Sequence, residues 1–300
     1  MRGIHEQRLH YFVEAVRLGS VRAAADALDI APSAVSRQIA QVEAELGVDL
    51  IERHRRGITP TEAGRLVLDY FRQRQTQLDG LRDAIADLQG LRTGRVVLAI
   101  GEGFIGDLSR SLGDFSARHP EIEVRVNVVG TNEVIRQVME DEAQLGLVFN
   151  PPRDPHLRVH GSRGQPLYAL VAPDHPLANV QAPVTLAELG EHRLAVPDIS
   201  YGIRQMLDAV EQAAGVRLAP TLTCNTFALL KHYAQQGGVT LLPLFAATQE
   251  LDSGALRALP LADPGFARAH VELVTRLGRK LSRAADELRT SLVQQMTAFR

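Results

Sequence analysis

Two patterns of hydrophobic and polar residues divide the chain near residue 93. Before that point, apolar residues recur every three or four positions, which is typical of amphipathic helices. From Arg95 onward, short continuous apolar runs alternate with helical patterns, and such runs are typical of buried strands in α/β domains. The pattern predicts a helical N-terminal part followed by an α/β part of about 200 residues, enough for two subdomains.

Residues 1–65 predict a winged helix-turn-helix. Residues 9–18 have the spacing of an amphipathic helix, Ser20 is a good N-cap for the next helix, and Pro32 suits the first turn of a third. Residues 48–59 then combine β-branched residues, arginines and a glycine, which predicts a short hairpin, or wing. The helix that begins at Pro32 is therefore a candidate to enter the major groove of DNA.

The next predicted element is one long helix over residues 61–91, which would span roughly 46 Å. Positions spaced alternately by four and three residues form the seam of a coiled coil: Val67, Phe71, Arg74, Leu78, Leu81, Ile85 and Leu88. Arg74 interrupts this seam. We expect the helix to pair with a second copy of the chain, and packing against its own domain is the alternative. Gly90, Thr93 and Gly94 then predict a hinge.

The rest of the chain, residues 93–300, predicts one domain of two subdomains. Its candidate strands are residues 96–100, 124–129, 145–149, 167–171, 194–196, 221–224, 239–242 and 271–275. Proline and glycine punctuate residues 158–165 and 261–269, which predicts that the chain crosses between the subdomains there. The first subdomain would then comprise residues 93–162 and 269–300, and the second residues 163–268.

Composition narrows the class of protein. No apolar run reaches the ~18 residues of a membrane span, and the N-terminus lacks the apolar core of a signal peptide. The single cysteine, Cys224, rules out an intramolecular disulfide and fits a reducing cytosol, so we expect a cytoplasmic protein. Residues 1–65 carry nine arginines and nine Asp or Glu, so their net charge is zero. Attraction to phosphate must therefore come from locally placed arginines, and Arg53, Arg55 and Arg56 form the one dense cluster.

Residues 8–64 carry a family resemblance. The matching positions are Leu9, Phe12-Val13, Gly19-Ser20, Ala24-Ala25, Leu28, Ser33-Ala34-Val35-Ser36-Arg37-Gln38-Ile39, Glu45-Leu46-Gly47, Leu50, Arg53 and Thr61-Glu62-Ala63-Gly64. This stretch resembles the LysR-type transcriptional regulators, and the downstream layout agrees with that family along the whole chain. The sequence departs from the family pattern at Pro32-Ser33, where Gln-Pro is frequent, at Ile51, where Phe is usual, and at Gln144, where Asp is usual.

The resemblance implies an α+β multidomain fold. Its parts would be an N-terminal winged helix-turn-helix, a long dimerising linker helix and a C-terminal two-subdomain α/β effector domain like that of periplasmic binding proteins. It also implies a function, that of a transcriptional regulator and not an enzyme. Such a protein binds double-stranded promoter half-sites as dimers that assemble into tetramers, and it responds to a small effector bound between the two subdomains.

We expect DNA contacts from the start of the second helix, the third helix and the wing. The expected residues are Ser20, Arg22, Ser33, Ala34, Ser36, Arg37, Gln38, Arg53, Arg55 and Arg56. Arg37 and Gln38 can each form two hydrogen bonds to a base edge. The short Ser33 and Ser36 let the backbone approach DNA, and the wing arginines can reach phosphate or the minor groove. A solvated helix face is the competing interpretation.

Residues 101–106 have the GxGxxG pattern of a dinucleotide-binding loop, and they follow a predicted strand. A Rossmann site also needs an acidic residue about 20 positions on, at the end of the second strand, to bind the ribose. Glu121 and Glu123 lie instead at the start of that strand. This mismatch disfavours a dinucleotide site, and an NAD-dependent enzyme is kept as the alternative function. We expect the glycines to keep a helix N-terminus open for an anionic or polar effector.

Ligands in such folds bind where strand ends and helix N-termini converge. By that rule the effector-binding candidates are Gly101, Glu102, Gly103, Phe104, Thr131, Asn132, Phe149, Ser200, Tyr201, Arg204, Thr226 and Phe227. Thr131, Ser200 and Thr226 can donate hydrogen bonds, with helix N-capping as the competing role. Arg204 can pair with a carboxylate or simply face water. The candidate effectors are a small organic acid, an aromatic carboxylate and an amino acid.

We expect no catalytic site, no metal and no cofactor. The chain has no Gly-x-Ser-x-Gly elbow, and neither Lys231 nor Lys280 follows a glycine as a phosphate-binding loop requires. His156 and His160 stand four apart in a segment expected to be extended, which disfavours a shared metal ion.

Besides the DNA-binding regulator and the NAD-dependent enzyme, a third hypothesis treats the helix-turn-helix as a protein-interaction module.

Overall fold

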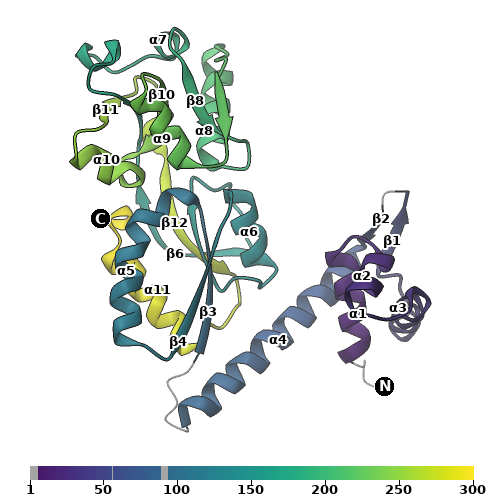
Figure 1. The fold of residues 1–300 in the computed structure, drawn as a ribbon. Coiled ribbons are helices and arrows are strands. Elements are labelled where there is room, and N and C mark those ends of the chain that lie inside the picture. The colour runs from purple at the N-terminus through teal and green to yellow at the C-terminus, as the bar shows by residue number, and fades with distance from the viewer. Residues whose placement is uncertain (1–5, 56, 89–93) are drawn as a thin grey trace. The chain divides into compact units, whose positions relative to one another are not determined.

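The computed structural model describes residues 6–55, 57–88 and 94–300, and the chain divides into two compact units, Met1–Asp79 and Gly80–Arg300 (Figure 1). The predicted hinge residues Gly90 and Thr93 and the wing residue Arg56 lie outside the described residues. Gly94, also predicted as part of the hinge, is the first residue of a strand.

The first unit is a small helical domain with a two-stranded wing. Its elements are α1 (Glu6–Arg17), α2 (Val21–Ala27), α3 (Pro32–Leu46), β1 (Ile51–His54), β2 (Gly57–Pro60) and the start of α4 (Glu62–Leu88). The apolar faces of the helices meet in a core that fully buries Leu9, Phe12 and Ile39. The Ser20 side chain caps α2 by accepting a hydrogen bond from the backbone N–H of Ala23 (3.3 Å), as predicted.

The first turn of α4 is fastened to the segment that leads into the wing. Thr61 Oγ1 donates to the carbonyl oxygen of Asp49 (2.8 Å) and accepts from the backbone N–H of Gly64 (3.0 Å). A Cβ on Gly64 would overlap the carbonyl oxygen of Leu50. This close approach requires glycine, because no other residue lacks a Cβ.

Two glycines of α4 are expected to respond in opposite ways to alanine. Gly64→Ala should destabilise the first unit by ~1–3 kcal/mol, because the new methyl group forces the backbone to shift. Gly80→Ala should stabilise the protein by ~0.5–1 kcal/mol, since alanine is the better helix former and nothing lies within 4 Å of the added carbon. Urea unfolding followed by circular dichroism measures both changes. A shift of the same sign in both variants would contradict the close approach at Gly64.

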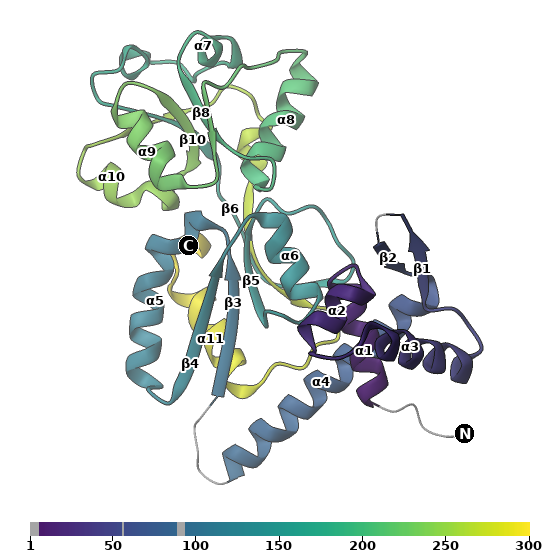
Figure 2. The same cartoon turned by 45° about the vertical axis from the view of Figure 1, so that its right-hand side comes forward.

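The second unit contains two five-stranded sheets flanked by helices (Figure 2). The first sheet comprises β3 (Gly94–Ile100), β4 (Ile122–Val128), β5 (Leu145–Phe149), β6 (Leu157–Gly164) and β12 (His270–Arg276), in the order β4-β3-β5-β12-β6. The second comprises β7 (Leu167–Val171), β8 (Leu194–Pro197), β9 (Leu222–Cys224), β10 (Val239–Pro243) and β11 (Arg257–Pro260), in the order β11-β7-β10-β8-β9.

Helices cover both faces of the first sheet because the residues of β3 alternate between two apolar clusters. Val96, Leu98 and Ile100 pack in one cluster with α5 (Ile105–Arg118) and α11 (Arg283–Gln295). Ala99 packs in the other with α6 (Thr131–Met139), which lies on the opposite face. The helices of the second sheet are α7 (Leu186–Gly190), α8 (Gly202–Ala214), α9 (Phe227–Gln235) and α10 (Thr248–Asp252).

The chain crosses between the two sheets after β6 and again after β11. The second crossing, over residues 261–269, confirms the prediction. The first prediction holds only at its end, because residues 158–164 form most of the strand β6, paired antiparallel with β12, and the chain crosses at residues 165–166. Neither β6 nor β11 was predicted as a strand. Both are edge strands with many exposed side chains, so they lack the continuous apolar run of a buried strand.

Strand direction also differs in part from the expected parallel arrangement. β3 runs parallel to β4 and β5, and β8 runs parallel to β9 and β10. β12 and β7, however, run antiparallel to their neighbours. A strand buried on both faces has the same apolar run in either direction, so its composition does not reveal its orientation.

Candidate functional site

The helix α3 presents one face to the core and the opposite face to solvent. Its buried residues are Val35, Ile39 and Val42. Ser33 and Arg37, four residues apart and therefore on the same side of the helix, are exposed. Ala34, Ser36 and Gln38 are half-buried beside them. The predicted residues of this helix thus form an accessible surface centred on Arg37.

The structure describes four of the five arginines predicted to meet DNA, and all four are exposed. They are Arg22 in α2, Arg37 in α3, Arg53 in β1 and Arg55 directly after β1. None of them forms an ion pair with a side chain that the structure describes. By contrast, Arg8 pairs with Glu45 and Arg17 with Glu14. A guanidinium group without a carboxylate partner remains available for the phosphates of nucleic acid.

The wing is attached to the turn before α2. The backbone N–H of Ile58 donates to the carbonyl oxygen of Gly19 (2.9 Å). Gly57 has φ +130°, and a Cβ there would overlap that same carbonyl oxygen. Ser20 follows directly and is half-buried, with its side chain used to cap α2. Backbone contacts therefore hold the start of α2 and the arginine-bearing wing together.

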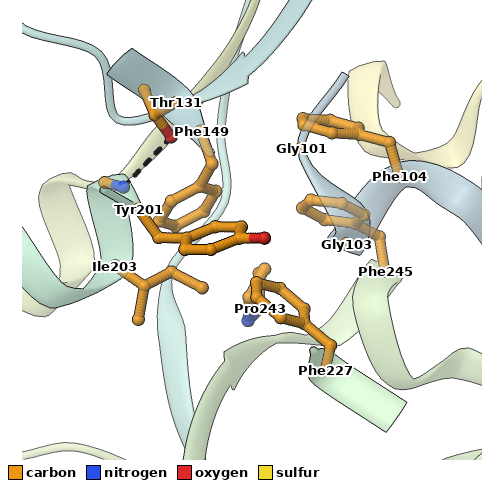
Figure 3. A pocket seen from close by; sticks show the side chains of 11 residues that line it. Gly101, Gly103, Phe104, Thr131, Phe149, Tyr201, Ile203, Phe227, Pro243 and Phe245 are labelled. Carbon is orange, nitrogen blue, oxygen red and sulfur yellow. Dashed lines mark hydrogen bonds between the residues drawn. The ribbon is translucent and has the colours of Figure 1, made fainter. Parts of the chain in front are cut away.

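In the second unit, a small cavity lies where strands of both sheets end (Figure 3). It is lined by Gly101, Gly103, Phe104, Thr131, Phe149, Tyr201, Gly202, Ile203, Phe227, Pro243 and Phe245. Its volume is about 20 Å³, which is room for roughly one water molecule.

Sequence rules found most of this lining. The predicted residues among it are Gly101, Gly103, Phe104, Thr131, Phe149, Tyr201 and Phe227. Gly202 and Ile203 belong to the turn at residues 200–204 that the same rule selects, whereas Pro243 and Phe245 were missed. Pro243 and Phe245 follow the predicted strand 239–242, so the strand-end rule that found the others would also have found these two.

Aromatic rings from both subdomains fill most of the space (Figure 3). The rings of Phe104 and Phe245 stack with their centroids 5.0 Å apart, and Phe149 lies 6.5 Å from Phe245. Tyr201 and Phe227 are 5.4 Å apart on the other side. A ligand of more than a few atoms must therefore displace rings to enter.

Four other candidate residues form hydrogen bonds with each other or with nearby side chains. Thr226 Oγ1 donates to Glu102 Oε1 (2.7 Å). Ser200 Oγ donates to a carboxylate oxygen of Asp198 (2.5 Å). Asn132 Oδ1 accepts from the side chain of Gln205 (3.1 Å). None of these residues contributes to the lining itself.

Arg204 does not reach the cavity. Its guanidinium pairs with Asp208 one turn further along α8 (2.5 Å) and lies 3.7 Å from Glu211. A carboxylate partner for Arg204 is thus supplied by its own helix.

Burial and the nearby charge of Glu102 raise the pKa of Tyr201 to about 12. The Tyr201 hydroxyl donates to the carbonyl oxygen of Asn225 (2.9 Å).

Both units match family models. Residues 7–65 match the bacterial regulatory helix-turn-helix protein, lysR family, and residues 89–297 match the LysR substrate binding domain. The chain belongs to the LysR family of transcriptional regulators. It is a DNA-binding regulator of transcription with an effector-binding domain.

Relatives of this LysR-family chain match along almost its whole length. The SDS degradation transcriptional activation protein of Pseudomonas sp. is 30% identical over 300 residues, 96% of this chain and 95% of that protein. The RuBisCO operon transcriptional regulator of Allochromatium vinosum is 28% identical over 291 residues, again 96% and 95%. A full-length OxyR variant from Pseudomonas aeruginosa has the same fold, with a TM-score of 0.68, 19% identity, and coverage of 100% of this chain and 98% of that one.

These comparisons do not support the NAD-dependent enzyme, because the relatives are transcriptional regulators. In this regulator Gly101 and Gly103 of the GxGxxG pattern line the cavity.

Among the described residues, no helix combines the length and the apolar character needed to cross a membrane.

Proposed function

We propose that this LysR-family regulator binds promoter half-sites as a homodimer and that an effector in the cavity of its second unit changes how it binds DNA. Residues 1–65 would contact DNA, residues 61–91 would pair the protomers, and residues 93–300 would bind the effector. The protein would act in the cytoplasm, where its promoters are accessible. The observation that carries the proposal is the exposed Arg37 at the centre of α3, with no ion-pair partner among the described side chains.

DNA contacts would come from three places on the first unit. The recognition helix would read bases with Arg37 and Gln38, because both side chains can form two hydrogen bonds to a base edge. Arg22 and the wing residues Arg53 and Arg55 would bind phosphate, and the same role is proposed for Arg56. Ser20, Ser33, Ala34 and Ser36 would lie against the DNA backbone and allow its close approach.

The exposed apolar face of α4 supports dimerisation. Val67 and Phe71, the first two seam positions, pack in the core of their own domain. Leu78, Leu81 and Ile85, further along the seam, expose 37%, 55% and 47% of their surface. Apolar residues at coiled-coil spacing are buried when two such helices pair. We propose that this part of α4 forms the homodimer and that dimers associate further into tetramers.

The cavity is suited to control because both subdomains contribute to it. Phe104 and Thr131 precede the first crossing, whereas Tyr201, Phe227 and Phe245 follow it. A ligand that binds between two such parts favours the arrangement in which it makes the better contacts. We propose residues 93–162 with 269–300, and residues 163–268, as the two subdomains that respond.

A gel-shift titration on the DNA upstream of the chain's own gene tests the proposal. The expected result is a complex that persists in an excess of unrelated DNA and weakens steeply as salt rises, because phosphate contacts release counterions. Failure to bind any promoter-proximal fragment, even at low salt, would contradict it. That outcome would favour a helix-turn-helix that contacts proteins.

A further inference from the structure

The side chains that line the cavity offer no counter-charge to an anion. Five are aromatic, Ile203 and Pro243 are aliphatic, and Thr131 is the one polar side chain besides the Tyr201 hydroxyl. Within the described part of the chain, no arginine, lysine or histidine contributes to the lining. Moving a carboxylate from water into such surroundings is unfavourable unless the charge is paired or hydrogen-bonded there.

Three hydrogen-bonding groups at or beside the cavity already have partners. The backbone N–H of Gly202, at the start of α8, donates to Thr131 Oγ1 (3.0 Å; dashed line in Figure 3). The hydroxyl of Tyr201 donates to Asn225, and that of Ser200 donates to Asp198. An entering carboxylate could therefore accept from the Gly202 N–H, the Tyr201 hydroxyl or the Ser200 hydroxyl only by displacing the present acceptor.

The chain places its own carboxylate at the edge of this cavity. Glu102 lies between Gly101 and Gly103, which both line the cavity. Its Oε1 accepts from Thr226 Oγ1 (2.7 Å) and from the backbone N–H of Ala228 (3.4 Å) in the first turn of α9. A helix N-terminus is a favourable position for an anion. Glu102 thus occupies the anion position that α9 would otherwise offer to a ligand.

The charge of Glu102 reaches the cavity. Burial is the main reason that the pKa of Tyr201 is raised to about 12, and the charge of Glu102, followed by those of Asp198 and Cys224, raises it further because these groups would repel a phenolate. A second anion beside them would meet the same repulsion, whereas a cation would be attracted.

We propose that this pocket selects a flat apolar compound that carries an amine and discriminates against carboxylates. The ammonium group would meet Glu102 and the faces of the surrounding aromatic rings, which attract cations. The apolar body would replace ring–ring contacts such as that of Phe104 with Phe245. These rings must turn aside, because a benzene-sized guest needs a cavity of about 150 Å³. The inference rests on the proposed function only in that it names the effector class of the same pocket.

Three probes with one carbon skeleton test the charge preference. Isothermal titration of the full-length protein with 2-phenylethylamine, 2-phenylethanol and phenylacetate should give affinities in that order, with about tenfold or more between amine and carboxylate. Phenylacetate binding as tightly as the amine, or no measurable binding of the amine, would overturn the proposal.

A charge-neutral variant locates the preference. Glu102→Gln should weaken the amine about tenfold or more and change the alcohol by less than about twofold, because only the charge-assisted contact is lost. Glu121→Gln, which removes the same charge from an exposed position before β4, should change neither. Equal effects of the two variants on the amine would overturn the proposal.

Promoter binding, measured by gel shift on the same protein without ligand, distinguishes a wrong effector class from a wrong function. If the protein binds its promoter and the probe order is reversed, the effector class alone is wrong. If the protein does not bind DNA, the proposed function fails whatever the order of the probes.

Discussion

Leu81→Glu is expected to convert the proposed homodimer into monomers and to weaken binding to a two-half-site promoter by about 10²–10⁴-fold. Leu81 is 55% exposed on α4, and in a paired coiled coil the same position is buried. Glutamate there would place two like charges, one from each protomer, in an apolar seam. Ile85→Glu, one turn further along, should have the same effect.

The large loss in affinity arises because two DNA-binding domains are no longer joined in one dimer, and not because a contact with DNA is removed. A dimer that has bound one half-site presents its second domain to the other half-site at a high effective concentration, and a monomer loses that advantage. Analytical ultracentrifugation measures the mass, and gel shift the affinity. Gln73→Glu is the control, because it adds the same charge at an exposed position of α4 outside the seam. A Leu81→Glu protein that stays dimeric and binds as wild type would exclude α4 as the dimerising element.

Arg37→Ala is expected to weaken promoter binding by about 10–100-fold for each half-site, because a two-hydrogen-bond contact to a base contributes ~1–3 kcal/mol. The loss should depend on sequence, with relaxed discrimination at one base pair of each half-site. Arg53→Ala should instead weaken binding to all sequences alike and lower the salt slope by about 1, as expected for a phosphate contact.

Competition gel shifts with single-base variants of the promoter distinguish the two arginines. Arg17→Ala is the matched control, because Arg17 is an arginine of the same domain whose guanidinium pairs with Glu14 (2.7 Å). Arg37→Ala binding every promoter variant with wild-type affinity would remove this residue from the base-reading surface.

Local signals in the sequence were sufficient for much of the fold. Ser20 caps α2, as its position before the predicted second helix indicates. The strand-end rule placed Phe149 and Tyr201 at the cavity. These features depend on residues close in sequence or on one topological rule. They can therefore be predicted without knowledge of tertiary contacts.

Features that depend on distant partners could not be predicted. The strand β6 lies at a sheet edge, so its apolar residues do not form a run that identifies it. The partner of Arg204 is a different case, because Asp208 lies four residues further along the same helix, a spacing that the sequence alone shows. The contact of Glu102 with Thr226 joins residues on opposite subdomains. Nothing in the neighbouring sequence of either residue indicates that contact.

Footprinting of the full-length protein on the DNA upstream of its own gene tests the central claim most directly. The expected result is two protected stretches whose centres lie about one helical turn, roughly 10–10.5 base pairs, apart. Both should disappear with Arg37→Ala at a protein concentration that saturates wild-type binding. Absence of protection, or protection that spreads without regard to sequence and persists in Arg37→Ala, would contradict a regulator that reads promoter half-sites through α3.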